Sequence, residues 1–180
     1  MARDDLQRMK QDLSIRRAEV GDLDGLVALE NLAFESDRVK ISRRQWAYLV
    51  RRPSGATFVL IASGEVLGAL VLAHRENGSM LRIYSLAVDP SARRRGCGRR
   101  LLEHADGYAQ ERGLDRIHLE VSVDNAAALS LYHQFGYRPV ARLSHYYGLG
   151  EDGWRMERVL DSREGPEADS SAEKISAATV

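Results

Sequence analysis

The chain has 180 residues, of which 44% are hydrophobic and 29% charged, and its 26 basic residues balance 26 acidic ones. This length predicts one globular domain whose core needs no disulfide and no structural metal. The single cysteine, Cys97, excludes an internal disulfide and argues against a four-ligand zinc site. The charged start and the absence of an apolar run of ~20 residues argue against a signal peptide or a membrane span, so we expect a cytoplasmic protein.

The composition changes along the chain and predicts three segments. Residues 1–12 form a charged N-terminal extension, and residues 13–160 form the folded domain. Residues 161–180 contain five acidic and two basic residues and no aromatic residue. Such a segment cannot bury enough apolar surface to offset its ordering entropy, so we predict a disordered acidic tail.

The hydrophobic periodicity of residues 13–160 alternates between strand and helix. The predicted strands are 13–18, 57–63, 66–74, 80–88 and 117–123, with a final hairpin of 137–147 and 154–160. The predicted helices begin at Gly21-Asp22, after a capping box at Ser42 and Gln45, after residues 93–100, and at Asn125. This order predicts an α/β fold (α+β in some schemes), with a mixed, mostly antiparallel sheet and helices on both faces.

The segment between strand 80–88 and the next helix carries the strongest functional signal. It contains glycines at 96 and 98 and five arginines within eight residues. Glycine lets a ligand approach the backbone, and a helix start offers free N–H groups and a positive dipole end. We therefore predict a site for an anion, most simply a pyrophosphate. The Walker and dinucleotide patterns do not match, because no Lys-Ser/Thr follows Gly98 and position 101 is leucine.

The remaining pattern, Arg-x-x-Gly-x-Gly at Arg93, Gly96 and Gly98, resembles the GCN5-related N-acetyltransferases (GNAT). Downstream, Leu119-Glu120-Val121, Asn125 and Leu131-Tyr132 are similar to the second half of that family, so the resemblance covers roughly residues 14–160. A late Tyr146-Tyr147 followed by Glu151-Asp152 is most similar to the RimI-type protein N-acetyltransferases.

The resemblance implies that acetyl-CoA is the co-substrate and that no metal is used. It implies that the backbone of Leu86, Ala87 and Val88 holds the pantetheine arm and that Asn125 bonds the cofactor. Asn125 could also cap its helix. Cys97 is interpreted as a small spacer and not as a nucleophile. The residues implied for the pyrophosphate are Arg93, Arg94, Arg95, Gly96, Cys97, Gly98 and Arg99.

The catalytic roles also come from the resemblance, which implies Glu120 as the base and Tyr132 as the acid. Glu120 stands between Leu119 and Val121, and a partly buried carboxylate there would suit this role. Strand alternation leaves a second possibility, a side chain that faces solvent. Tyr132 could likewise be a core aromatic residue.

The acceptor side is predicted at Phe34, Tyr146 and Tyr147. The two tyrosines would grip a peptide, or they would form an aromatic cross-strand pair. The loop after Phe34 lacks the Pro-Trp pair usual in the RimI-type enzymes, and its Glu35 and Asp37 could attract a cationic amine. Deprotonation at pH 7 costs about 1 kcal/mol for a terminal amine and about 4.6 kcal/mol for lysine, which favours the former.

Three functions therefore remain open. The first is acetyl transfer from acetyl-CoA to a protein or peptide amine, an α-amine or a lysine, and the second is transfer to a small-molecule amine. The third, from another class, is an arginine-rich nucleic-acid-binding module, against which the balanced charge argues. The histidines at 118, 133 and 145 lack metal-binding spacing. We expect no membrane partner and a monomer or homodimer.

Overall fold

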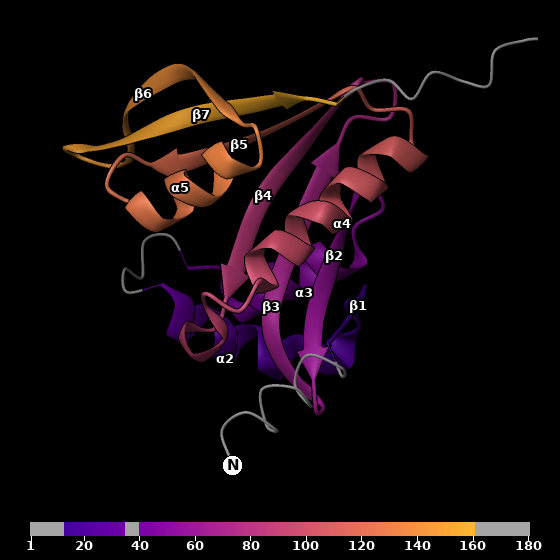
Figure 1. Ribbon diagram of the computed structural model, residues 1–180. Helices are drawn as coiled ribbons and strands as arrows, with labels where there is room; N and C mark the ends of the chain where they lie inside the picture. Colours follow the sequence, from indigo (N-terminus) through magenta and orange to yellow (C-terminus); the bar gives the residue numbers. More distant parts are fainter. Residues whose placement is uncertain (1–12, 35–39, 161–180) are drawn as a thin grey trace, which may run out of the picture.

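The computed structural model describes residues 13–34 and 40–160 (Figure 1). The predicted extension 1–12 and the predicted tail 161–180 lie outside the described residues, as do Glu35 and Asp37. The expectations for these segments therefore stay predictions.

A seven-stranded sheet forms the described domain, with the strand order β1-β2-β3-β4-β5-β7-β6. Every neighbouring pair is antiparallel except β4 and β5, which run parallel. The predicted mixed, mostly antiparallel sheet is confirmed. The strands are β1 Ser14–Arg17, β2 Gly55–Ala62, β3 Glu65–His74, β4 Met80–Val88, β5 Arg116–Ser122, β6 Arg138–Gly148 and β7 Glu151–Val159.

The helices cover both faces of the sheet, as predicted. They are α2 Leu23–Ala33, α3 Arg43–Arg51, α4 Cys97–Glu111 and α5 Ala126–Gln134, with short 3-10 turns at Val20–Asp22 and Pro90–Ala92. In Figure 1, α4 lies in front of β2–β4, while α2 and α3 lie behind them. Val59 and Val71 point to the α2 and α3 side, and Leu60 and Leu70 point to the α4 side. Because both faces are covered, β2 and β3 are almost continuously apolar.

Helix α3 begins at the predicted capping box. The Ser42 N–H donates to Gln45 Oε1 at 2.8 Å, and the Gln45 N–H donates to Ser42 Oγ at 3.4 Å. This exchange satisfies backbone donors at the helix start and positions Trp46, which is fully buried against α2 and the sheet.

Strands β4 and β5 separate part of the way along their length. They pair from Met80–Ile83 with Arg116–Leu119 and not beyond, among the residues that the structure describes. On the other side of β4, Leu72 pairs with Ile83 and Val71 with Ser85, so Tyr84 is an extra residue in the ladder. Such a bulge bends a strand and increases its twist. Figure 1 shows the result, in which β5, β7 and β6 diverge from β2–β4.

Glu30 of α2 has a buried carboxylate. Its side chain is 2% exposed, and its Oε1 accepts a hydrogen bond from the Ile41 N–H at 2.8 Å. Its Oε2 has no hydrogen-bond partner within the described part of the chain. Burial raises the pKa of Glu30 to about 6, despite the opposing effects of the Ile41 hydrogen bond and Lys40. The hydrogen bond therefore links α2 to the residues just before α3. Burying the charged carboxylate for this bond costs desolvation free energy.

The substitution Glu30→Gln should stabilise the protein at neutral pH. A pKa raised from 4.5 to about 6 makes folding most favourable below pH 4.5, and that contribution is lost as the pH rises through 6. Glutamine keeps an oxygen for Ile41 and carries no charge. Urea unfolding at about pH 7.5 should give a gain of about 1–2 kcal/mol, which vanishes near about pH 4.

Glu65→Gln is the matched control, because Glu65 is exposed at the start of β3. Its effect on the unfolding free energy should stay within about 0.5 kcal/mol at both pH values. An equal change for Glu30→Gln at both pH values would show that burial of the charge is not the cause.

Candidate active site

The loop after β4 leads directly into α4 at the predicted pyrophosphate site. Asp89 begins it by accepting a hydrogen bond from the Ser91 N–H through Oδ1 at 2.7 Å. Gly96 caps α4 with φ +84°, a left-handed conformation that disfavours other residues, and no atom lies within 4 Å of where its Cβ would be. The first N–H groups of α4 have no partner within the helix, so an anion can approach them.

Helices α4 and α5 touch at Gly98. A Cβ at position 98 would lie 2.9 Å from Leu131 Cδ2, which is closer than side chains tolerate. The glycine thus serves close helix packing as well as the loop. Cys97, beside it, is buried, and burial raises the pKa of its thiol. A buried, protonated thiol supports the spacer interpretation of Cys97.

The five arginines of the loop differ in what they contact. Arg93 donates from Nε to the Val88 carbonyl at 3.3 Å and from Nη2 to the Ala33 carbonyl at 3.1 Å. Arg100 donates to the Leu13 carbonyl at 3.3 Å, and Arg99 lies over the Phe135 ring at 5.4 Å. All five arginines are exposed, and the carbonyl contacts above belong to Arg93 and Arg100. Arg93 therefore joins the loop to the end of α2, which limits the uniform basic patch that a nucleic-acid-binding module would need.

The other residues predicted to bind the cofactor are the end of β4 and Asn125. Leu86, Ala87 and Val88 occupy the end of β4 beyond its last pair with β5, so this edge of β4 is open toward the gap. Asn125 caps α5, with Oδ1 accepting from the Ala128 N–H at 3.1 Å. The capping role considered for Asn125 is confirmed, and its contact with a cofactor stays a prediction.

Glu120 lies on β5 with its carboxylate only 5% exposed. The possibility of a solvent-facing side chain is therefore wrong, because two arginines of neighbouring strands cover it. Arg82 of β4 contacts Oε2 through Nε at 3.1 Å and Nη2 at 2.9 Å. Arg155 of β7, the cross-strand partner of Glu120, contacts Oε1 through Nε at 3.2 Å. Each carboxylate oxygen thus accepts from a guanidinium.

Tyr132 approaches the same gap from the opposite face of the sheet. It packs in the α4-side core with Leu119 and Val121, whereas Glu120 points to the other face of β5. Its ring contacts Tyr137 edge-on, with centroids 5.7 Å apart. Burial raises the pKa of Tyr132 to about 12, so the phenol keeps its proton at neutral pH. The predicted core packing and the predicted acid role are compatible.

Tyr146 and Tyr147 lie where β6 leaves its ladder with β7. In the β6–β7 ladder, Leu143 pairs with Gly153 and the next pair is Gly148 with Glu151. Four residues of β6, 144–147, therefore lie opposite the single residue Asp152 of β7. The tyrosine rings contact one another at 5.0 Å, so the pair is between sequence neighbours, and the predicted cross-strand pair is wrong. The outward bulge of β6 is the reason.

This bulge directs the two tyrosines toward Glu120. The Tyr146 hydroxyl accepts a hydrogen bond from Arg82 Nη2 at 3.0 Å. A Cβ at position 153 would lie 3.2 Å from Tyr147 Cε2, so the glycine there makes room for that ring. Burial and the neighbouring Tyr146 raise the pKa of Tyr147. Phe34 lies at the end of α2 and packs against the α2 and α3 core.

Sequence reasoning missed Arg82 and Arg155. Each is a single charged residue in an apolar stretch, Leu81-Arg82-Ile83 and Trp154-Arg155-Met156, which was a signal that could have been used. Only the register of three strands reveals that both reach one carboxylate. The gap between β4 and β5 therefore has Gly96 and Tyr132 on one side and an ion cluster on the other.

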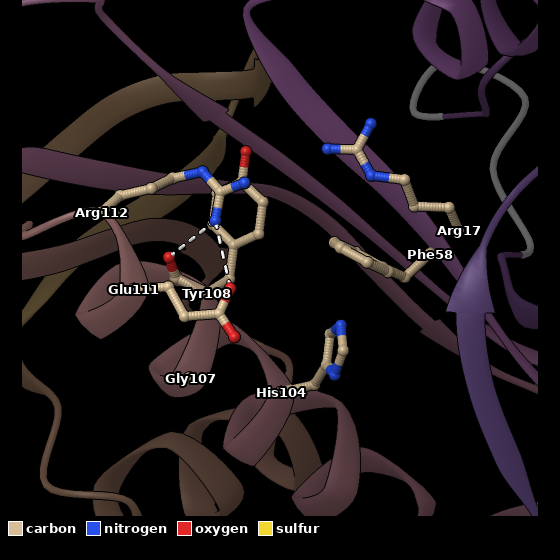
Figure 2. A pocket seen from close by; sticks show the side chains of 7 residues that line it. All are labelled: Arg17, Phe58, His104, Gly107, Tyr108, Glu111 and Arg112. Atoms are coloured by element: carbon tan, nitrogen blue, oxygen red, sulfur yellow. Dashed lines mark hydrogen bonds and ion pairs between the residues drawn. The ribbon is translucent and has the colours of Figure 1, made fainter.

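A separate hollow lies beside the C-terminal half of α4, where Phe58 of β2 meets His104 edge-on at 4.3 Å (Figure 2). Arg112 lies 3.6 Å above the Tyr108 ring and closes one end. Burial lowers the pKa of His104, which favours its neutral form. None of the predicted site residues lines this hollow. Its lining is Arg17, Phe58, His104, Gly107, Tyr108, Glu111 and Arg112.

Within residues 13–34 and 40–160, no three His, Cys, Asp or Glu side chains form a group that could hold a metal ion. No helix there has the length and apolar character needed to cross a membrane.

Comparison with known proteins gives consistent matches. Residues 23–137 match the model of the acetyltransferase (GNAT) family. The chain is 42% identical over 65 residues to a ribosomal protein bS18-alanine N-acetyltransferase of Salmonella typhimurium, a match covering 36% of this chain and 44% of that relative. It is 28% identical over 161 residues to an N-alpha-acetyltransferase of Sulfurisphaera tokodaii, covering 83% of this chain and 95% of the other.

The same likeness extends to three dimensions. The crystal structure of the ribosomal-protein-S18-alanine N-acetyltransferase from Escherichia coli superposes with a TM-score of 0.75 at 26% identity. That superposition covers 86% of this chain and 97% of the other. The family match over residues 23–137 includes α4 with its glycine start, Glu120 and Tyr132. The chain belongs to the acetyltransferase (GNAT) family.

Proposed function

We propose that this protein transfers the acetyl group of acetyl-CoA to a primary amine of a protein or peptide. The observation that carries the proposal is the gap between β4 and β5, which has an anion-accepting helix start on one face and a polar cluster on the other. Two relatives whose names describe acetylation of protein amines support this acceptor class.

The residues on the α4 side fit the proposed co-substrate. The open edge of β4 at Leu86–Val88 offers backbone groups to an extended, amide-containing arm such as pantetheine. The α4 start and the exposed Arg94, Arg95 and Arg99 suit a pyrophosphate. Acetyl-CoA would supply the thioester carbonyl, and the amine would attack it directly to give an amide and a free thiol.

The two catalytic side chains divide the proton transfers. An ammonium must lose a proton before it can attack, and Glu120 receives it. Both oxygens of Glu120 already accept hydrogen bonds from guanidinium groups, and the side chain is 5% exposed. We propose that a water molecule relays the proton from the amine to a remaining lone pair. Tyr132 has a pKa of about 12, so its phenol is protonated at neutral pH and donates its proton to the departing thiolate.

The acceptor would enter from the face where Glu120, Tyr146 and Tyr147 lie. An α-amine has a pKa of about 7.7–8.0 and a lysine about 10.4, so the α-amine reaches the nucleophilic form at lower cost. A base that acts through a water molecule is sufficient to remove a proton from an amine of this pKa. We therefore favour a protein or peptide N-terminus over a lysine side chain.

Binding of acetyl-CoA and acetylation of a peptide test the function together. Wild-type protein should melt at a higher temperature with acetyl-CoA and should add one acetyl group to peptide amines, as measured by mass spectrometry. Gly96→Val should weaken acetyl-CoA binding at least about tenfold, since it strains the left-handed residue and fills the space before α4. Gly107→Ala, in the open middle of α4, is the control and should bind normally. A wild type that neither binds acetyl-CoA nor acetylates amines would refute the proposal.

Glu120→Gln tests the base. The amide oxygen can still accept a hydrogen bond from one of the two arginines, whereas the NH2 group cannot accept from the other, and the amide cannot take up the proton. We expect kcat/KM to fall about 100-fold with acetyl-CoA affinity unchanged, measured across the neutral pH range. Wild-type turnover at every pH would remove Glu120 from this role.

Tyr132→Phe tests the acid and has a matched control in Tyr137→Phe. Both rings are buried and contact one another, and the Tyr137 hydroxyl has no hydrogen-bond partner in the described part of the chain. Tyr132→Phe should lower kcat about 10–100-fold, whereas Tyr137→Phe should keep wild-type turnover and stability. Equal rates for the two variants would show that the thiolate leaves without this acid.

A further inference from the structure

The acceptor face of the site carries more positive than negative charge. Arg82 and Arg155 both contact the single carboxylate of Glu120. The carboxylate is 5% exposed, whereas the arginine side chains are 36% and 42% exposed. The negative charge is thus buried beneath two cations that solvent and an incoming acceptor can reach.

The guanidinium groups have donors left after binding Glu120. Each guanidinium carries five N–H groups in a planar fork. Arg155 uses Nε for Glu120, and Arg82 uses Nε and Nη2 for Glu120 and Tyr146. Among the residues that the structure describes, neither Nη of Arg155 nor Nη1 of Arg82 has a hydrogen-bond partner. A second carboxylate could therefore be bound by two N–H groups at once.

The neighbouring charges leave this excess in place. His118, the next side chain on the same face of β5, is half-buried, and burial lowers its pKa so that the neutral form is favoured. Glu157 is the cross-strand partner of His118, two pairs along the β5–β7 ladder from Glu120 and Arg155. Asp152 at the hairpin is bound to Arg142 at 2.9 Å. The charge nearest to Tyr146 is the guanidinium of Arg82.

We propose that Arg82 and Arg155 select acceptors that carry a carboxylate close to the reactive amine, namely peptides whose first or second residue is Asp or Glu. This proposal rests on the acetyl transfer proposed above. The amine would lie toward Glu120 and its water, and the acidic side chain would bind the free N–H groups of Arg155 and Arg82. A free acidic amino acid carries the same pair of groups, an amine and a nearby carboxylate, so the experiment includes free glutamate.

A peptide panel measures this preference as a ratio. Two sets of peptides, which differ only in having Glu, Gln or Lys at the first or at the second position, are acetylated side by side with free glutamate, and kcat/KM is measured for each. The wild type should prefer the Glu peptide over the Gln peptide about tenfold or more, and the preference should shrink as salt is added. Faster turnover of free glutamate than of every peptide would overturn the peptide assignment.

Arg155→Met separates charge recognition from a general loss of rate. The variant removes the charge and keeps an unbranched stem, and its contact with Glu120 means that the absolute rate can fall for all peptides. The Glu-to-Gln ratio of kcat/KM should nevertheless drop to about one. Arg155→Lys, which keeps the charge without the fork, should retain part of the ratio. Arg138→Met, an exposed arginine of the same hairpin, should leave the ratio unchanged.

The outcomes distinguish the two proposals. Equal turnover of Glu and Gln peptides by the wild type, or an unchanged ratio in Arg155→Met, overturns the selection of acidic acceptors while the acetyl transfer stands. Absence of acetylation of every amine tested overturns the proposed function, and the acceptor preference falls with it.

Discussion

The separation of β4 from β5 is the constraint on which the site depends. Both strands belong to one sheet as far as Ile83 and Leu119, and the extra residue Tyr84 bends β4 where the pairing ends. A continuous parallel ladder would satisfy the backbone of both strands and leave no passage between the two faces. Divergence opens the edge of β4 and lets α5 reach the gap from one face and Glu120 from the other. Cofactor and acceptor can therefore approach a common point from opposite sides.

The two buried carboxylates Glu120 and Glu30 are stabilised in different ways. Glu120 is compensated by two guanidiniums, which remain partly in water and bring their own charge to the acceptor face. Glu30 has one backbone N–H for one oxygen and nothing within the described chain for the other, and burial raises its pKa to about 6. The first arrangement keeps a charge beside the proposed acceptor site, while the second fixes the start of α3 at some cost in stability.

The arginines of residues 93–100 show that a run of positive charge in the sequence does not by itself predict which side chains are available to bind an anion. Five arginines within eight residues predict a uniform anion site, yet Arg93 bonds the carbonyls of Val88 and Ala33 and Arg100 bonds that of Leu13. Part of the positive charge therefore holds the proposed cofactor loop and the start of α4 against the end of α2 and the chain before β1. Arg93 in particular connects the proposed cofactor site with Ala33 at the end of α2.

Much of the fold could be predicted from the sequence because strand and helix periodicities, the Ser42 capping box and the glycines at 96 and 98 are local signals. The order of elements also predicted helices on both faces of the sheet, and the family resemblance proposed Glu120 and Tyr132 as catalytic residues. The burial of Glu120, the sideways pairing of Tyr146 with Tyr147 and the Arg82 and Arg155 cluster could not be predicted. All three features depend on the register between β4, β5, β7 and β6. A shift of one residue in that register would move every side chain of a strand to the other face of the sheet. The sequence by itself determined which elements form and where the loop chemistry lies, whereas the tertiary structure alone decided which charges surround the proposed base.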